Sequence, residues 1–514
     1  MGRHDDYEDE FYDDEELLEE DSLALRERLR RKVVAVFGTS YGISLLVHGA
    51  VLLILASIVI AGAPAEREAK VLTNIERRID PVDPEIKTAL KKTPEIPIPD
   101  DNKVPRVNFD DPVVQEVPKG EPDNATDRNL ERKSVETAIG VGATGGAGAW
   151  GDPRAARRAS FMGRCGTPAY EAAPRAALDW LKRHQSPDGH WDADGWEGRC
   201  GRGGCKGPGH AQGMGGVDPG LTALSVLAFT GYGITHRHGE FKLTVEKARR
   251  WLCRLQRDDG SIGYAEGGQH AGMYNHAIAT MALAELFGTT RDFTLRRPVQ
   301  RAVDFCLKAQ NPNLGWRYRV RSGANDTSVT GWMVLALKAA RVAGIEVSDE
   351  VFAGAKRWFD RATNSAGEAG YTGPDGSSAV LPENDGKFEG VPTMTAVAVV
   401  CRIFTGERTT SESVRKGARQ LATALPAWQT RRTNFYYWYY GTYAMYQVDG
   451  RAWKDWERAM LSALVPHQRN GGCEHGSWDP VGEWCAAGGR VYATAINALT
   501  LEIHYRYARQ TAKG

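Results

Sequence analysis

Apolar side chains recur in the second half of the chain in six copies of a two-helix pattern. The first helix of each copy places four side chains at i, i+3, i+4 and i+7, which is one face of an α-helix. The first set is Ala177, Trp180, Leu181 and His184. The other sets begin at Ala248, Ala302, Ala355, Ala418 and Met460, and the fifth is degenerate. Such regular repetition predicts a repeat architecture.

The second segment of each copy is apolar nearly all round, and a helix without a polar face must be buried. These segments are residues 221–229, 277–287, 329–342, 394–404, 440–448 and 492–503. The first helices keep a charged face, as in residues 246–250. We therefore predict an inner layer of apolar helices and an outer amphipathic layer. Glycines follow five inner segments where left-handed caps are expected: Gly231, Gly288, Gly344, Gly406 and Gly450.

The first and last copies are as apolar as the middle ones. An open solenoid would need polar capping repeats at its ends. The pattern therefore predicts an all-α fold in which six hairpins close into an α/α toroid, an α6/α6 barrel.

The turns between the paired helices carry a second repeated signal. Segments such as Gln185 to Trp191 and Gln310 to Trp316 run from glutamine through glycine to tryptophan. These turns resemble the QW motifs of the terpenoid cyclase and protein prenyltransferase α/α-toroid superfamily. The resemblance implies a central cavity for isoprenoid substrates, with one mouth at the N-termini of the inner helices. It also implies a structural role for Gln185, Trp191, Gln256, Gln310, Trp316, Gln468 and Trp478.

The catalytic motifs of that superfamily are not recognisable in the sequence. Its cyclases use an Asp-x-Asp-Asp motif, whereas Asp192-Ala-Asp194 lies in a glycine-rich turn. Its zinc-dependent prenyltransferases use Asp, Cys and His ligands; Asp326-Thr-Ser328 resembles part of that set, but Ser328 and Ala493 replace the cysteine and the histidine. We therefore expect no cofactor, and a binding or scaffold module for an isoprenoid-like or glycan ligand. An isoprenoid-processing enzyme with a divergent site is the alternative.

Candidate ligand-binding side chains stand near the starts of the inner helices. They are Asp218, His276, Asp326, Thr393, Tyr437, Trp438 and Tyr492. Aspartate or threonine at such a position commonly caps the helix. The aromatic run at residues 435–440 is typical of either a ligand pocket or plain core packing.

Charge is segregated along the first 151 residues, although the whole chain has no formal net charge. Residues 1–32 form an acidic, then basic tail. Residues 33–65 carry no charge, and their apolar core at 41–62 is long enough to span a bilayer. The basic cluster places the tail in the cytoplasm and the rest outside. A cleaved signal peptide is the rival, but a 32-residue leader disfavours it.

After the predicted span, residues 66–151 are rich in proline and then in glycine, as in an extended linker. The toroid is expected over residues 152–514. The neutral overall balance gives no indication of nucleic-acid binding.

A histidine inside a membrane span is costly and indicates function. Ser44 and His48 lie one turn apart and share a helix face. This pair resembles the Ser-x-x-x-His element of TonB/TolA-type energy transducers, which implies docking on a proton-driven channel complex. An ordinary anchor with His48 near the interface is the other interpretation.

All eight cysteines follow the predicted span, where disulfides can form. We expect one disulfide between Cys200 and Cys205 and another between Cys473 and Cys485. The alternative is a metal bound by Cys200, Cys205 and His210, with His190 as a further candidate.

Overall fold

The computed structural model describes residues 168–200, 213–378, 390–429 and 431–506, with Arg158 and a few residues near the N-terminus. Within these ranges the chain is helical, and its β structure consists of isolated bridges. The expected span over residues 33–65 lies outside the described residues, apart from His48, and stays a prediction. None of the described helices combines the length and apolar composition needed to cross a membrane.

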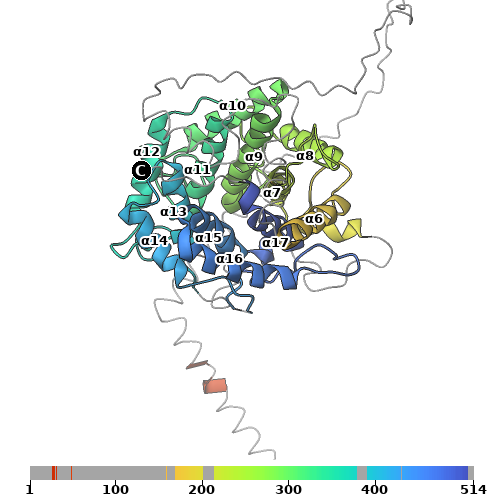
Figure 1. The fold of residues 1–514 in the computed structure, drawn as a ribbon. Coiled ribbons are helices and arrows are strands. Elements are labelled where there is room, and N and C mark those ends of the chain that lie inside the picture. Colours follow the sequence, from red (N-terminus) through yellow and green to blue (C-terminus); the bar gives the residue numbers. More distant parts are fainter. Residues whose placement is uncertain are drawn as a thin grey trace, which may run out of the picture. The chain divides into compact units, whose positions relative to one another are not determined.

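Six helices form a closed inner ring (Figure 1). They are α7 (Asp218–Gly231), α9 (Gly268–Thr290), α11 (Thr327–Val342), α13 (Thr393–Phe404), α15 (Phe435–Val448) and α17 (Cys485–Leu501). Each packs against the next, and α17 packs against α7. This closure confirms the predicted all-α toroid.

Six amphipathic helices surround the ring. They are α6 (Pro168–Arg183), α8 (Lys242–Arg254), α10 (Phe293–Ala309), α12 (Asp349–Ala362), α14 (Glu412–Ala422) and α16 (Gly450–Leu464). Each of the outer helices α8, α10, α12, α14 and α16 packs on the inner helix that precedes it in the chain, and α6 packs on α17. Short helices η1 (Trp196–Arg199), η3 (Val465–His467) and α18 (Ile503–Arg506) complete the described fold.

Three of the predicted glycine caps have a positive φ, namely Gly344, Gly406 and Gly450. The prediction was wrong for Gly231 and Gly288, which lie inside α7 and α9. The left-handed residues are instead Gly233 and Arg291. A Cβ at Gly231 would lie 2.0 Å from Glu502 Oε2, so this glycine allows close packing rather than a turn.

Glutamines in the turns tie neighbouring hairpins together. Gln185 Nε2 donates to the carbonyl of Gly189 in its own turn at 2.8 Å and to that of Thr244 in α8 at 2.9 Å. Gln256 and Gln310 repeat this pattern with carbonyls in α10 and α12. These contacts confirm the structural role implied by the QW resemblance.

The last of these glutamines joins the end of the ring to its beginning. Gln468 Nε2 donates to the Gly476 carbonyl at 2.8 Å and to the Ala173 carbonyl in α6 at 2.8 Å. Gly476 itself lies so close to α6 that a Cβ would stand 2.1 Å from the Ala176 carbonyl oxygen. We call this junction of the last turn with the first hairpin the seam.

Tryptophans Trp191, Trp316 and Trp478 anchor the same turns and are fully buried. Each indole N–H donates at 2.8 Å to a backbone carbonyl near the end of the preceding outer helix. Each backbone N–H donates to a threonine of the inner helix. These threonines are Thr222, Thr330 and Thr494.

In the second hairpin a histidine takes the place of that threonine. Ile262 N–H donates to His276 Nδ1 at 3.1 Å, and His276 Nε2 lies 3.2 Å from the Ala302 carbonyl oxygen. His276 is fully buried. Its side chain thus supports a turn, and the structure gives it no place in a ligand cavity.

The C-terminal ends of the inner helices are filled by the chain itself. Arg506 of α18 donates to both carboxylate oxygens of Glu285 in α9, at 2.8 and 2.9 Å. It also donates to the Leu227 carbonyl in α7 at 2.6 Å and the Tyr443 hydroxyl in α15 at 3.2 Å. Because these helices stand on different sides of the ring, Arg506 lies within it and fills the end formed by the C-termini of the inner helices.

Replacing Gln468 by alanine should lower the free energy of unfolding by about 2 kcal/mol, since two hydrogen bonds across the seam are lost. Chemical denaturation measures this change. Gln420→Ala is the control, because Gln420 Nε2 makes an exposed 3.2 Å bond to the Ala366 carbonyl. Equal losses in the two variants would contradict the role of the seam.

His276 should make folding sensitive to acid. Burial lowers its pKa to about 4, whereas an unfolded histidine titrates near 6.5. A depressed folded-state pKa contributes stability above about pH 6.5, which is lost as pH falls toward 4. A shift of this size corresponds to about 3 kcal/mol.

His276→Thr keeps an acceptor for Ile262 N–H but cannot titrate. The smaller side chain should lower the melting temperature at neutral pH. The difference in melting temperature between the variant and the wild type should narrow as pH falls from about 7.5 to about 4.5, because only the wild type loses the contribution of neutral His276. The other titrating groups are common to both proteins. A gap that stays constant would rule out the titration of His276 as its cause.

Candidate functional site

Asp326 is a buried carboxyl at the mouth of the ring. It precedes α11, and its Oδ1 accepts the Val329 N–H at 2.7 Å as an N-cap. Its Oδ2 makes no hydrogen bond to the described residues, and Arg317 Nε stands 3.9 Å away. Burial raises the pKa of Asp326 to about 7, and the Val329 N–H, Arg317 and the Tyr371 side chain oppose this rise. The group can therefore hold or release a proton near neutral pH.

Tyrosines from neighbouring loops and helices surround this carboxyl. The hydroxyls of Tyr318 and Tyr371 share a short hydrogen bond, and the Arg317 guanidinium lies 5.2 and 5.8 Å from their ring centroids. Tyr274, near the start of α9, has a pKa raised well above its usual value by burial and then by Asp326 and Tyr371. All three tyrosines are half-buried.

Tyr436 approaches Asp326's helix from across the ring. Its hydroxyl lies 2.9 Å from Ser328 Oγ, although α13 separates α11 from α15 around the ring. Its ring stacks on Trp332 with centroids 6.2 Å apart and meets Trp484 edge-on at 6.3 Å. Aromatic side chains thus meet across the interior between α11 and α15.

A second buried carboxyl, Glu483, lies just before α17. Asn434 Nδ2 donates to its Oε2, while Asn434 Oδ1 caps α15. Burial raises the pKa of Glu483 to about 7. Burial raises the pKa of Tyr492 well above its usual value, and Tyr436 and Glu483 contribute to that rise. We call the two carboxyls and five tyrosines at this end of the ring the mouth cluster. They are Asp326, Glu483, Tyr274, Tyr318, Tyr371, Tyr436 and Tyr492.

Of the predicted ligand residues, Asp326 and Tyr492 belong to the mouth cluster. Thr393 begins α13 at the same end; it is buried, and its hydroxyl makes no hydrogen bond to the described residues. Asp218 has a turn contact instead, since its Oδ1 accepts the Ala193 N–H at 2.9 Å.

The neighbours Tyr437 and Trp438 face the outer layer. The Tyr437 hydroxyl donates to the Ala424 carbonyl at 2.9 Å, and the Trp438 ring lies 5.3 Å from Phe435 and 6.3 Å from Trp428. Core packing therefore accounts for this part of the aromatic run. Adjacent positions of one helix thus serve different purposes, with Tyr436 at the mouth and Tyr437 in the core.

The sequence pattern did not indicate Tyr274, Tyr318, Tyr371 or Glu483, and it indicated Tyr436 only as part of the aromatic run at residues 435–440. In the fourth hairpin Ala369 occupies the position of the anchoring tryptophan, because its N–H donates to Thr395 Oγ1. A usable signal exists in the turns. A tyrosine stands two residues after the anchoring position in three successive repeats, at Tyr264, Tyr318 and Tyr371.

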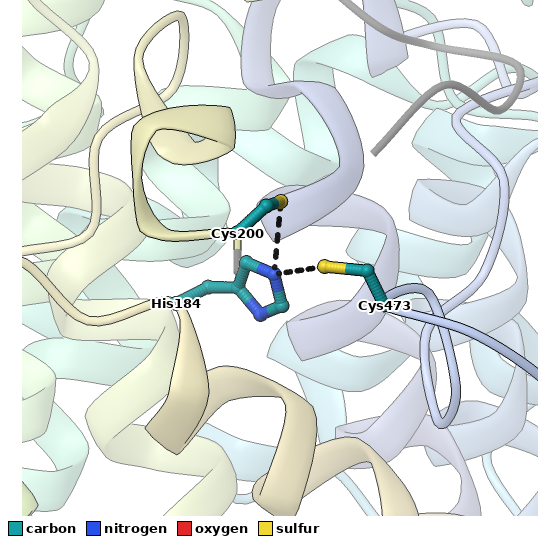
Figure 2. A group of neighbouring side chains, drawn as sticks. All are labelled: His184, Cys200 and Cys473. Atoms are coloured by element: carbon teal, nitrogen blue, oxygen red, sulfur yellow. Dashed lines mark hydrogen bonds between the residues drawn. The ribbon is translucent and has the colours of Figure 1, made fainter. Parts of the chain in front are cut away.

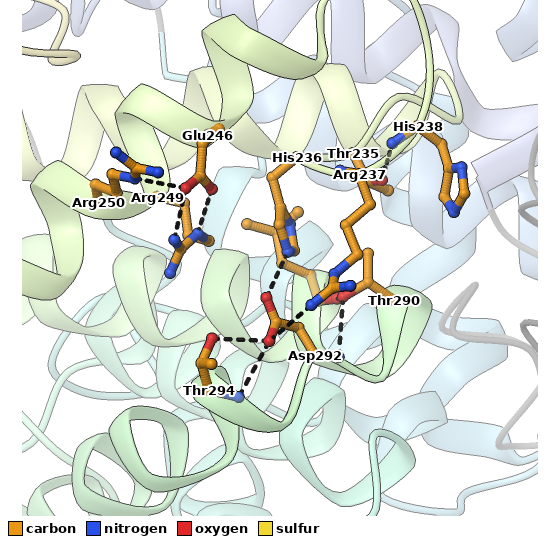
Figure 3. Close-up of polar contacts among 11 residues, drawn as sticks. Thr235, His236, Arg237, His238, Glu246, Arg249, Arg250, Thr290, Asp292 and Thr294 are labelled. Carbon is orange, nitrogen blue, oxygen red and sulfur yellow. Dashed lines mark hydrogen bonds and ion pairs between the residues drawn. The ribbon is translucent and has the colours of Figure 1, made fainter. Parts of the chain in front are cut away.

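A separate polar cluster lies at the opposite end of the ring, where α7 and α9 end (Figure 3). Asp292 Oδ2 contacts His236 Nε2 at 2.9 Å, and its Oδ1 contacts Arg237 Nη2 at 3.0 Å and caps α10 through Thr294. Although burial opposes the shift, hydrogen bonds from Thr294 and His236 hold the pKa of Asp292 well below its usual range. These contacts join two loops, which indicates a structural role.

The predicted Cys473–Cys485 disulfide is not formed in the structure, where both residues are free thiols. Cys485 is buried, and burial raises its pKa to about 12. Cys205 and His210 lie outside the described residues. His190 pairs with Asp188 at 2.6 Å. Cys200 and Cys473 instead approach His184 (Figure 2).

No protein-family model and no curated protein matches the chain. Among solved structures, it is similar to the type II terpene cyclase MstE from Scytonema, at 13% identity and a TM-score of 0.44, over 66% of this chain and 97% of that one. A variant of MstE in complex with geranylgeranyl dihydroxybenzoate gives the same values. An α-amylase from Clostridium perfringens is 10% identical, with a TM-score of 0.41 over 65% and 97% of the two chains. Identities this low transfer no ligand or residue role.

Proposed function

We propose that the toroid binds a hydroxyl-rich ligand, a glycan, at the mouth cluster. One observation carries the proposal. Half-buried tyrosine rings stand around a buried carboxyl, Asp326, whose Oδ2 makes no hydrogen bond to the described residues. A ligand hydroxyl would supply the missing partner.

The composition of the mouth favours a glycan over an isoprenoid. Aromatic faces pack well on apolar surfaces, including the C–H face of a sugar ring. Phenol hydroxyls and carboxyls with a pKa near 7 can donate or accept hydrogen bonds to sugar hydroxyls. An isoprenoid chain would leave these polar groups buried without partners, which costs free energy.

Acid–base catalysis is the second candidate function. Asp326 and Glu483 both have a pKa raised to about 7 by burial. A carboxyl that keeps its proton near neutral pH can act as a general acid on a glycosidic oxygen, with a second carboxyl as base or nucleophile. Release of product distinguishes this function from binding alone.

The cellular setting in this proposal rests on the sequence. Residues 33–65 anchor the chain, residues 66–151 tether the toroid outside the membrane, and the ligand is a component of the cell envelope. A second alternative function is that of a proton-motor-coupled transducer, in which the helix face with Ser44 and His48 docks on a proton-channel partner.

Calorimetric titration of the full-length chain in detergent with neutral and acidic oligosaccharides and a polyprenyl alcohol tests the proposal. We expect an oligosaccharide to bind. Tyr436→Phe should weaken that binding about tenfold, the effect of losing one hydrogen bond of about 1.4 kcal/mol. Affinity should change through about pH 7, and the Asp326→Asn, Glu483→Gln double variant should show no such change.

Tyr437→Phe is the matched control, because it removes a buried hydroxyl from the next residue of the same helix on the face away from the mouth. It should leave affinity unchanged. Equal effects of the two tyrosine variants, or binding of the polyprenyl alcohol alone, would refute the glycan site. Oligosaccharide turnover that Asp326→Asn abolishes would establish the catalytic function instead.

A further inference from the structure

Three side chains with metal-binding atoms converge at the seam (Figure 2). His184 directly follows α6, Cys200 directly follows η1, and Cys473 lies between η3 and α17. His184 Nε2 stands 3.3 Å from Cys473 Sγ and 3.5 Å from Cys200 Sγ. The three ligand atoms all lie within 4.8 Å of one another.

The two nitrogen–sulfur separations match the corresponding edges of a tetrahedral zinc site. Zinc binds histidine nitrogen at about 2.0 Å and cysteine sulfur at about 2.3 Å, which places the two ligand atoms about 3.5 Å apart in a tetrahedron. Both nitrogen–sulfur distances are close to that value. A single ion can therefore contact all three atoms after only small movements of the side chains.

The imidazole is oriented as a metal ligand. His184 Nδ1 lies 2.8 Å from the Trp180 carbonyl oxygen, so Nδ1 carries the proton and Nε2 turns its lone pair toward both sulfurs. A neutral imidazole is the form that binds a metal.

The surroundings suit an uncharged cluster. The His184 ring is 1% exposed, stacks on Trp180 with centroids 4.1 Å apart, and meets Trp196 edge-on at 5.7 Å. Two thiolates cancel the charge of one Zn²⁺.

We propose that His184, Cys200 and Cys473 bind a zinc ion that fastens the seam. Two thiolates and one imidazole select zinc over hard cations such as magnesium or calcium. The ion would join side chains 289 residues apart, which are brought together only when the ring is closed. A fourth tetrahedral position remains for water or another ligand.

A Cys200–Cys473 disulfide is the competing use of the two thiols. It would give His184 no role, whereas in the structure both sulfurs approach the same unprotonated nitrogen. The convergence on Nε2 is the reason for choosing the metal.

Zinc content of the full-length chain, purified without chelators, tests the site. We expect about one zinc per chain, and its loss in His184→Ala, Cys200→Ala and Cys473→Ala. Removing zinc from the wild type with a chelator should lower the melting temperature by several degrees, because binding energy at such a site is folding energy. Cobalt substitution should give the visible bands of tetrahedral thiolate coordination.

Two further variants separate loss of a ligand from loss of fold. Cys473→His replaces one ligand by another and should keep zinc with an altered cobalt spectrum. Cys253→Ala removes a half-buried thiol of α8 that lies outside the cluster, and should keep zinc unchanged. Zinc retained after all three ligands are replaced, or a wild-type chain without metal whose mass falls by two hydrogens through a Cys200–Cys473 bond, would overturn the proposal.

Discussion

Packing of α17 against α7, and of α6 against α17, decides whether the six hairpins form a ring or an open stack. In an open stack the apolar faces of the first and last hairpins would meet water, and burial of such faces is the main favourable term in folding. A Cβ at Gly488 would meet Tyr492 of its own helix at 2.4 Å and Leu221 of α7 at 3.2 Å, so this glycine lies at the contact between α17 and α7. Gln468 adds directional bonds to this apolar contact, and a zinc ion at His184 would add a third kind of link.

Closure makes the two ends of the ring different. At one end the bidentate pair of Arg506 and Glu285 is fully buried, so each charge depends on the other for compensation. At the other end Asp326 and Glu483 are buried carboxyls whose pKa values rise to about 7. The N-terminal end therefore carries the buried carboxyls with raised pKa values, with half-buried tyrosines beside Asp326.

The two-layer toroid could be predicted from the sequence because its cause is local. Helical periodicity indicates which helices are amphipathic, and segments that are apolar all round indicate which helices are buried. Because the first and last copies are as apolar as the middle ones, a ring is the simplest arrangement. Glycine is less informative, because the same residue serves a positive φ at Gly344 and close packing at Gly231. His276 shows that a helix-start histidine can replace a structural threonine.

The candidate sites could be predicted only in part. Asp326 and Tyr492 were among the candidates because the superfamily resemblance implies a mouth at the starts of the inner helices. Tyr318, Tyr371 and Glu483 come from loops, whose conformation the helical pattern does not specify. The approach of Cys473 to His184 joins the last hairpin to the first. The two residues are far apart in the sequence, so spacing along the chain favoured local disulfides instead.

Native-state hydrogen exchange of the full-length chain tests ring closure most directly. A ring has no terminal repeats, so the buried amides of α6, α7 and α17 should exchange with opening free energies like those of α11 and α13. An open stack frays from its ends. Much lower opening free energies confined to the first and last hairpins would contradict the closed ring.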